Sequence, residues 1–227
     1  MDIKGYDATS GYRAVLEKDM LPGTKVTMHF MRTTAGFGAT FLSRQAASSI
    51  PFSSAELPAI LNHFSLEPNS FKAQSIEKTL HECETPAVDG ETKYCATSLE
   101  SMVEYTTSTL RSRNVLALST VMSKEGAPTQ QYTIAPSGVK KLSGKDFVAC
   151  HARKYPYAIF YCHKVEGITA YQASMVGEDG TTVEAMAVCH TIIAGPDAQG
   201  YLSGLQYEPG VPVCHILPQD HIVWSNK

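Results

Sequence analysis

Four of the six cysteines are followed at once by a histidine, and this repeated doublet constrains the fold more than any other feature of the sequence. The doublets are Cys150-His151, Cys162-His163, Cys189-His190 and Cys214-His215. Only 8 of the 227 residues are histidine, so four such coincidences would arise by chance with a probability on the order of one in a million. The doublets therefore predict a shared structural role.

Strand geometry gives the doublets a physical meaning. Neighbouring residues of a β-strand point to opposite faces of the sheet, so each cysteine and the histidine after it would act on different sides. If two of these strands pair and their cysteines bond on one face, we expect the two histidines to meet on the other. Directly opposed residues have Cβ atoms roughly 4.5–5.5 Å apart, which lets two imidazoles share one metal ion. Four doublets then predict two disulfide staples and two histidine pairs.

The cysteine pattern favours disulfides over thiolate chemistry. No Cys-x-x-Cys pair occurs, and zinc ribbons and thioredoxin-like redox sites need that spacing. Six cysteines allow 15 connectivities, which all stay open, but spacing favours three pairs: Cys150 with Cys162, Cys189 with Cys214, and Cys83 with Cys95. An even cysteine count indicates an oxidising compartment. The first residues contain no apolar leader segment, so we expect a signal peptide that has been removed, with a cytosolic chain as the less favoured alternative.

With the cysteines oxidised, imidazoles are the ligands left for a metal ion. They suit copper, zinc, nickel and iron, and among divalent ions the Irving–Williams order places copper highest. An oxidising compartment and a site without thiolates favour Cu(II) or a catalytic zinc. Neutral imidazole is the binding form, so we expect affinity to fall below about pH 6. Two other interpretations stay open: disulfide cysteines beside solvated or core histidines, and a structural zinc site with mixed cysteine and histidine ligands.

Other polar residues give weaker signals. His221 lies six residues after His215 and three before the single tryptophan, Trp224, and is either a fifth metal ligand or a surface residue. Glu184 and Asp220 lie near two of the doublets in the sequence and could orient imidazoles, although a solvated role is the simpler interpretation. The sequence contains no Ser-His-Asp signature, phosphate-binding loop or Gly-x-Gly-x-x-Gly motif.

Charge and hydropathy exclude several classes of function. There are 19 basic and 22 acidic side chains, a formal net charge of −3, and no block of like charges. A nucleic-acid-binding or polybasic membrane-surface protein is therefore disfavoured. The longest apolar runs, such as 115–118 and 157–162, are far shorter than the roughly 20 residues that cross a bilayer. We expect a soluble globular protein.

The hydrophobic pattern changes from helical to strand-like along the chain. Residues 1–13 are expected to form a flexible lead-in to a single domain over 14–227. A strand is expected at 26–31, followed by helices over 57–64, about 71–82 and 99–110, the last with a capping box formed by residues 97–100. After residue 114, a period of two predicts strands near 115–121, 130–135, 146–152, 157–163, 168–176, 182–191, 201–207, 211–217 and 221–224. The sequence therefore predicts an α+β fold, in which an N-terminal strand and helices pack on a mainly antiparallel, sandwich-like or barrel-like C-terminal half.

The spacing of the doublets resembles that of the plant BURP-domain proteins. The gaps between successive doublets are 10, 25 and 23 residues, and 8 residues separate the last doublet from Trp224. The resemblance extends upstream to the stretches 16–23, 50–54 and 90–102, includes 155–161 between the first two doublets, and covers residues 14 to 224. It implies the fold of that domain and a secreted plant protein, in the apoplast, the cell wall or the vacuole.

The resemblance also implies a chemistry. Some members of the family are similar to oxidases: copper and dioxygen generate a radical that joins a Tyr or Trp side chain to a carbon of a ribosomally made core peptide, closing a macrocycle. Carried over to this chain, the partner cysteines would be disulfide staples, and the ligands of two type II copper centres would be His151, His163, His190 and His215. We therefore expect a copper-dependent peptide cyclase whose partners are dioxygen and a core peptide supplied in cis or in trans.

Two departures limit what can be carried over. Family members commonly have a Trp-Asn-Pro-x-His stretch after the third doublet, which is replaced here by residues 192–200 without a histidine. Self-modifying members contain a core tryptophan, whereas this chain has only Trp224, with Tyr6 and Tyr12 in the lead-in. A substrate in trans is therefore the simpler interpretation. The alternatives are a non-enzymatic cell-wall or seed protein, such as the non-catalytic subunit associated with a polygalacturonase, and a metal-dependent hydrolase.

Overall fold

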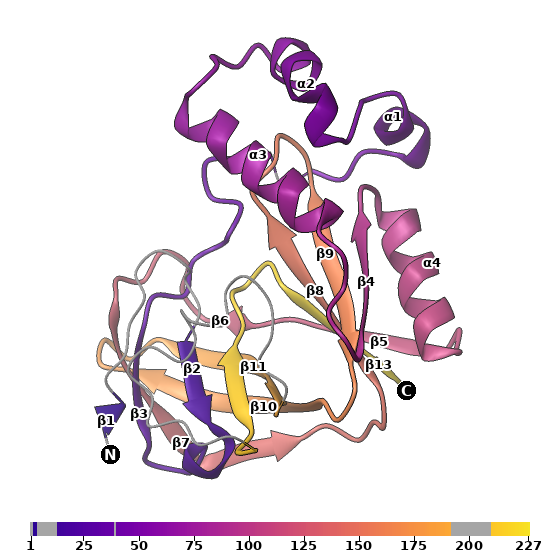
Figure 1. Cartoon of the computed structure of the whole chain (residues 1–227). Coiled ribbons are helices and arrows are strands. Elements are labelled where there is room, and N and C mark those ends of the chain that lie inside the picture. Colours follow the sequence, from indigo (N-terminus) through magenta and orange to yellow (C-terminus); the bar gives the residue numbers. More distant parts are fainter. Residues whose placement is uncertain (1, 4–12, 39, 192–209) are drawn as a thin grey trace.

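Two β-sheets and a group of helices at one end build the molecule (Figure 1). The computed structural model describes residues 2–3, 13–38, 40–191 and 210–227. The fold is α+β with mainly antiparallel strands, as the sequence predicts. Most of the expected lead-in, with Tyr6 and Tyr12, and the strand expected at 201–207 lie outside the described residues.

The larger sheet combines strands from both ends of the chain. Its order is β1-β3-β7-β10-β11-β12-β2, with β6 paired to β11, and all its pairs are antiparallel except β1 with β3. A register shift on β10, between Ala173 and Met175, interrupts the β7–β10 ladder. The strands are β1 (Asp2–Ile3), β2 (Arg13–Leu16), β3 (Lys25–Met28), β6 (Val121–Met122), β7 (Gln130–Lys141), β10 (Thr169–Gly177), β11 (Thr182–His190) and β12 (Val213–Ile216).

The smaller sheet has the order β4-β9-β8-β13-β5, and each neighbouring pair is antiparallel. Its strands are β4 (Glu91–Ala96), β5 (Val115–Leu118), β8 (Phe147–Arg153), β9 (Ile159–Val165) and β13 (Ile222–Asn226). Strands from the first half of the chain thus occur in both sheets, so the two halves share one structure.

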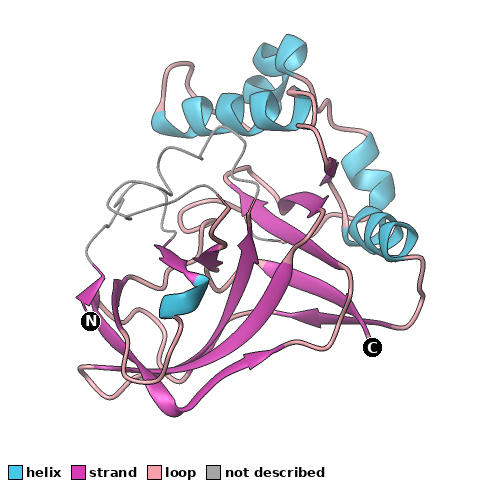
Figure 2. Ribbon diagram, turned by 60° about the horizontal axis from the view of Figure 1, so that its bottom comes forward, coloured by secondary structure: helices cyan, strands magenta, loops and turns pink. Residues whose placement is uncertain are grey.

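The α-helices lie together at one end of the molecule, away from the larger sheet (Figure 2). They are α1 (Arg44–Ser48), α2 (Leu57–His63), α3 (Phe71–Glu84) and α4 (Leu99–Leu110), with short 3₁₀ turns η1 (Glu17–Asp19) and η2 (Ser54–Glu56). The Ser70 hydroxyl caps α3 by accepting from the backbone N–H of Ala73 at 3.1 Å. None of the described helices is long and apolar enough to cross a membrane.

Several local expectations were wrong. The capping box of α4 is formed by Ser98 and Ser101, one residue later than expected, because Ser98 and not Thr97 is the N-cap residue. The strand expected over 115–121 divides into β5 and β6, which belong to different sheets. The sequence pattern also missed β2, β4 and α1, which are short or half-polar, and β3 ends at Met28.

Buried side chains form four clusters, and one of them places the site. The first fills the curve of the larger sheet and includes Val26 and Met175. The second lies between the smaller sheet and α4, and the third packs the helices against 155–159. The fourth joins the two sheets through Phe147 on β8 and Val188 on β11. One part of the layer between the two sheets is therefore filled by apolar side chains.

Candidate metal centre

Three disulfides connect the elements around the histidines, and they are the pairs that spacing favours. Cys150 and Cys162 lie directly opposite each other on β8 and β9. The same holds for Cys189 and Cys214 on β11 and β12. The third disulfide ties α3 to β4 through Cys83 and Cys95. Each doublet cysteine is fully buried in an apolar cluster, on the face of its sheet away from the histidine that follows.

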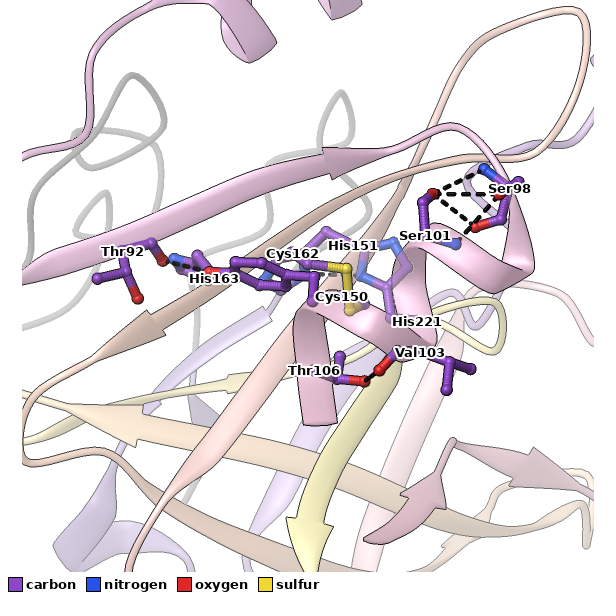
Figure 3. The surroundings of a disulfide bond; sticks show 11 residues. Thr92, Ser98, Ser101, Val103, Thr106, Cys150, His151, Cys162, His163 and His221 are labelled. Carbon is purple, nitrogen blue, oxygen red and sulfur yellow. Dashed lines mark hydrogen bonds between the residues drawn. A yellow bond between two sulfur atoms is a disulfide. The ribbon is translucent and has the colours of Figure 1, made fainter. Parts of the chain in front are cut away.

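The first histidine pair is diagonal, which corrects the expected geometry. Because β8 and β9 are antiparallel and Cys150 opposes Cys162, His151 opposes Tyr161 while His163 opposes Ala149. Diagonal neighbours have Cα atoms roughly 7–8 Å apart, a gap that only long side chains cross. The two imidazoles cross it and bring their Nε2 atoms to 3.1 Å (Figure 3).

The second pair repeats this arrangement on the larger sheet. His215 opposes Val188 and His190 opposes Val213, so these two rings are also diagonal. Their Nε2 atoms lie 2.9 Å apart, and their ring centroids 4.9 Å apart. The structure therefore brings together the four doublet histidines as two pairs, one in each sheet.

Both pairs face the layer between the two sheets. Residues two apart on a strand point to the same side, so His151 shares a face with Phe147 and His190 shares a face with Val188. Phe147 and Val188 both belong to the apolar cluster that joins the sheets. The four histidines therefore lie in the layer between the two sheets, next to its apolar cluster.

His221 lies beside the first pair and is buried, so it is not the surface residue of one interpretation, and its role as a fifth ligand stays a prediction. Its side chain is fully buried, immediately before β13, and its Nδ1 lies 2.9 Å from Nδ1 of His151. Its Nε2 lies 2.8 Å from the hydroxyl oxygen of Thr33. Asp220 holds that loop in place, because its carboxylate accepts from the backbone N–H groups of Thr33 and Thr34, both at 2.9 Å.

Glu91 is the site residue that the sequence reasoning missed. Its Oε1 lies 2.7 Å from Nδ1 of His163 and accepts from the Tyr161 hydroxyl at 3.0 Å. Burial alone would raise the pKa of Glu91, but its hydrogen bonds with His163 and Tyr161 hold that pKa below its ordinary value. A signal for Glu91 did exist: after the turn at 89–90, Thr92, Tyr94 and Ala96 alternate in strand fashion.

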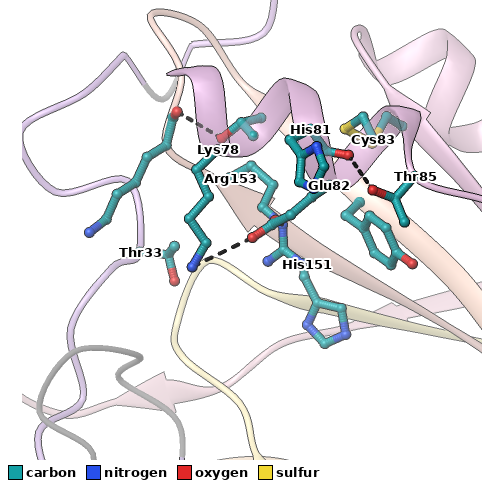
Figure 4. A network of polar contacts seen from close by, with 12 residues as sticks. Thr33, Lys78, His81, Glu82, Cys83, Thr85, His151 and Arg153 are labelled. Atoms are coloured by element: carbon teal, nitrogen blue, oxygen red, sulfur yellow. Dashed lines mark hydrogen bonds and ion pairs between the residues drawn. A yellow bond between two sulfur atoms is a disulfide. The ribbon is translucent and has the colours of Figure 1, made fainter. Parts of the chain in front are cut away.

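A second polar network surrounds Tyr161 on the side of α3. Arg153 lies beside Glu82 (Figure 4) and forms an ion pair with it at 2.7 Å. The Arg153 guanidinium lies 5.1 Å from the centre of the Tyr161 ring. Lys93 lies at the same 5.1 Å from this ring and donates to the backbone carbonyl of Glu82 at 2.7 Å. Burial, together with the neighbouring Glu91, raises the pKa of Tyr161 well above its ordinary value. These contacts fix Tyr161, and through Glu91 they support His163.

The buried imidazoles are held in the neutral form. Burial lowers the pKa of His151 well below its ordinary value, and it lowers the pKa of His215 and of His221 to about 3 in each case. Neighbouring rings add to this effect at His151 and His215, whereas Asp220 opposes it at His221. The contribution of His163 to the low pKa of His215 acts from one pair on the other. Neutral imidazole is the form that binds a metal ion.

The carboxylates singled out from sequence differ in their outcome. Glu184 is exposed on β11 and accepts hydrogen bonds from Gln172 and Ser174 at 3.1 and 3.0 Å. It orients none of the described imidazoles through a hydrogen bond, which agrees with the solvated interpretation. Asp220 acts on His221 directly, because its Oδ1 lies 3.9 Å from Nε2 of His221, and also through the loop that carries Thr33.

The donor set fits a metal ion such as copper. Metal–nitrogen bonds of about 2.0–2.1 Å, at angles between a right angle and the tetrahedral angle, place two ligand nitrogens about 2.8–3.4 Å apart. The facing Nε2 atoms of the two pairs lie 3.1 and 2.9 Å apart. Within the described part of the chain, no group of three or more histidine, cysteine or acidic side chains is arranged to hold a metal ion. Each pair thus offers two nitrogen ligands.

Comparison with known proteins identifies the class of the chain. The family model of the BURP domain matches residues 15–226. BURP domain-containing protein 3 of rice is 50% identical over 218 residues, and the match covers 93% of this chain and 50% of that protein. BURP domain protein RD22 of Arabidopsis thaliana is 45% identical, with coverages of 92% and 54%. BURP domain-containing protein 6 of rice is 47% identical, with coverages of 92% and 87%.

The comparisons and the geometry of the site agree on the class of protein. In this chain, two pairs of strands are each joined by a disulfide and each carry two facing histidines. The chain belongs to the BURP domain family. It spans about half the length of two of these relatives, the first rice protein and RD22.

Proposed function

We propose that this chain is a copper- and dioxygen-dependent peptide cyclase that forms side-chain macrocycles in a ribosomally made core peptide. The observation that carries the proposal is the pair of facing Nε2 atoms in each sheet, 3.1 and 2.9 Å apart, behind a disulfide that fixes the strands. The ligands are His151 and His163 in one sheet and His190 and His215 in the other, with His221 as a fifth candidate.

The protein contributes a rigid and neutral ligand set. Burial keeps His151, His215 and His221 as neutral imidazoles. Metal binding therefore does not first require the deprotonation of an imidazolium cation at these residues. The directly opposed cysteines hold each strand pair in register, which limits how far the imidazoles can separate. When bound, copper supplies one-electron chemistry with dioxygen, and imidazole is among its preferred ligands.

The proposed reaction is balanced by dioxygen. Joining a Tyr or Trp side chain to a carbon of the peptide forms one new bond and removes two hydrogen atoms from the substrate. Dioxygen accepts these two electrons and two protons as hydrogen peroxide. The core peptide is supplied in cis or in trans, and Tyr6 and Tyr12, the candidates in cis, lie outside the described residues.

We place the protein in the secretory pathway or outside the cell. The three disulfides support this, because such bonds persist in oxidising compartments. They close every cysteine of the chain into a structural pair.

A non-enzymatic role is the second candidate, and one observation favours it. The rings of the first pair already have hydrogen-bonding partners at both nitrogens, from Thr33 at one end to Glu91 at the other. A buried polar network satisfied in this way can serve to fix the strands alone. In that case the chain would be a structural cell-wall or seed protein.

The direct test is the mass of the peptide product. The purified chain, loaded with Cu(II) under air, would be incubated with Tyr- and Trp-containing peptides, and the products examined by mass spectrometry. We expect the peptide to lose the mass of two hydrogen atoms under air and to keep its mass when oxygen is excluded. His163→Ala should abolish the loss, whereas His81→Ala, at an exposed position on α3, should retain it.

Other masses would have other meanings. Addition of one water would show a metal-dependent hydrolase instead. Unchanged peptides, in a preparation that binds copper, would contradict the cyclase and favour the non-enzymatic role.

A further inference from the structure

An unbroken chain of side-chain hydrogen bonds runs through the first histidine pair. Oγ1 of Thr33 lies 2.8 Å from Nε2 of His221, whose Nδ1 lies 2.9 Å from Nδ1 of His151. Nε2 of His151 lies 3.1 Å from Nε2 of His163, whose Nδ1 lies 2.7 Å from Oε1 of Glu91. Five residues from five separate segments therefore share one line of four hydrogen bonds.

The two ends of this chain differ in chemistry. An ionised carboxylate only accepts hydrogen bonds, whereas a hydroxyl both donates and accepts. Glu91 is further committed to accepting, because its Oε1 also receives the Tyr161 hydroxyl. Thr33, at the other end, can reverse its role by rotating its hydroxyl hydrogen. The acceptor role of Glu91 is thus fixed, whereas Thr33 can act either as donor or as acceptor.

The fixed end determines where every proton lies. His163 must carry its proton on Nδ1 to donate to Glu91, and a neutral ring has only one, so its Nε2 accepts. His151 then donates from Nε2 and accepts at Nδ1. His221 donates from Nδ1, and its Nε2 accepts from Thr33. When every ring carries a single proton, only this assignment satisfies all four contacts, with the fourth proton on the hydroxyl.

We propose that Glu91 is a positioning residue that keeps Nε2 of His163 free of a proton. We further propose that Thr33 allows the hydrogen bonds from His151 through His221 to reverse their donor and acceptor roles when a metal ion binds between His151 and His163. Only one proton occupies that gap, the one on Nε2 of His151. With a metal ion held by these two Nε2 atoms, that proton would leave and His151 would receive the Nδ1 proton of His221. His221 would then take a proton on Nε2 and donate it in a hydrogen bond to Thr33. One proton leaves at the gap and one enters at the Thr33 end, so no ring changes its charge.

The first half of the proposal concerns the metal-free protein alone, and the second half rests on the proposed metal function. Carboxylate partners of ligand histidines commonly fix the tautomer in this way, and their removal lowers metal affinity roughly 10- to 100-fold. The added feature here is the relay through His221, which couples the ligand His151 to the hydroxyl of Thr33, a residue whose backbone N–H donates to Asp220.

The test is nitrogen-15 NMR of histidine side chains, which distinguishes the two tautomers of each ring. In the metal-free protein we expect the proton on Nδ1 of His163, Nε2 of His151 and Nδ1 of His221. Glu91→Gln should weaken this preference at His163, since an amide can also donate to Nδ1. Glu184→Gln, the matched change of an exposed carboxylate on the other sheet, should leave it unchanged.

Zn(II), which is diamagnetic, then tests the second half. On its addition His151 and His221 should exchange tautomers, while His163 keeps its own. Thr33→Val should weaken zinc binding, and Thr33→Ser, which keeps the hydroxyl, should restore it. Glu91→Gln should lower zinc affinity roughly 10- to 100-fold.

Each contrary result has a separate meaning. A doubly protonated His163, with the other two rings in the opposite tautomers, would overturn the role of Glu91. Zinc binding without exchange at His151 and His221 would overturn the relay. The expected metal-free tautomers together with no metal binding would uphold Glu91 as the ordering residue, overturn the relay, and count against the proposed function.

Discussion

The two histidine pairs are built in the same way but are supported differently. Each has opposed cysteines, diagonal histidines and Nε2 atoms about 3 Å apart. The disulfide of the pair on the smaller sheet packs beneath α4, and that of the other pair lies within the curve of the larger sheet. The first pair also extends through defined hydrogen bonds to Glu91 and His221.

This difference separates what the doublet supplies from what its surroundings supply. Two antiparallel strands with opposed cysteines are sufficient to bring two imidazoles together, because both sheets achieve it. The orientation and the tautomer of a ring depend on further residues, such as Glu91 beside His163. The doublet therefore acts as a repeated unit, and the residues around it decide how each copy behaves.

The largest expected effect is loss of stability in acid. Burial lowers the pKa of His215 and of His221 to about 3, so these rings stay neutral in the folded state while the unfolded chain takes up protons below about pH 6.5. Each such ring should cost the metal-free protein about 1.4 kcal/mol of unfolding free energy per pH unit, as an upper limit, between about pH 6.5 and pH 3. The contribution is fully present above that range.

This prediction compares the pairs directly. The first region has two rings with a lowered pKa, His151 and His221, and the second has His215. Urea unfolding at several pH values, with a chelator present, should show that His151→Gln with His221→Gln reduces the acid slope about twice as much as His215→Gln. Equal reductions would mean that the two regions are equally buried in solution.

Removal of the doublet disulfides should have the next largest effect. The loop closed by Cys150 and Cys162 has a sequence separation of 12, and that closed by Cys189 and Cys214 has one of 25. Loop-closure entropy gives losses of about 3 and about 3.5 kcal/mol for the two Cys→Ala double variants. Urea unfolding of both variants measures this difference, and a larger loss from the shorter loop would show that the chain-entropy account fails here.

A smaller effect is expected from one hydroxyl. Tyr161→Phe removes a donor from Glu91. Tyr171→Phe, on the larger sheet, removes the equivalent donor from Glu17. Each should lower stability by about 1 kcal/mol, the usual net value of one hydrogen bond. Only Tyr161→Phe should shift the NMR signals of His163. A similar shift in the Tyr171 variant would contradict a local role for Glu91.

Much of the site could be predicted from the sequence, because the doublets encode it locally. The alternation of a strand places cysteine and histidine on opposite faces whatever the rest of the fold, and the favoured pairing of the six cysteines occurs in the structure. The error lay in the register. In an antiparallel pair with opposed cysteines, the residue after each cysteine cannot oppose its counterpart, so the histidines are diagonal.

The rest of the site depends on contacts that local patterns do not contain. Thr33 reaches His221 across 188 positions of the chain, and Glu91 reaches His163 across 72. Glu91 also begins a strand whose polar side chains hide its alternation. The fold class was predictable from the change of period, whereas the division of 115–121 between two sheets depends on tertiary pairing.

Copper binding by the separate pairs tests the central claim most directly. The purified chain and its His163→Ala, His190→Ala and His81→Ala variants would be titrated with Cu(II), and the copper content and electron paramagnetic resonance spectrum measured. We expect one copper for each histidine pair in nitrogen-rich tetragonal sites, loss of one signal in His163→Ala, loss of the other in His190→Ala, and no change in His81→Ala. Substoichiometric copper that is indifferent to all three substitutions would contradict the account and leave the histidines a structural role.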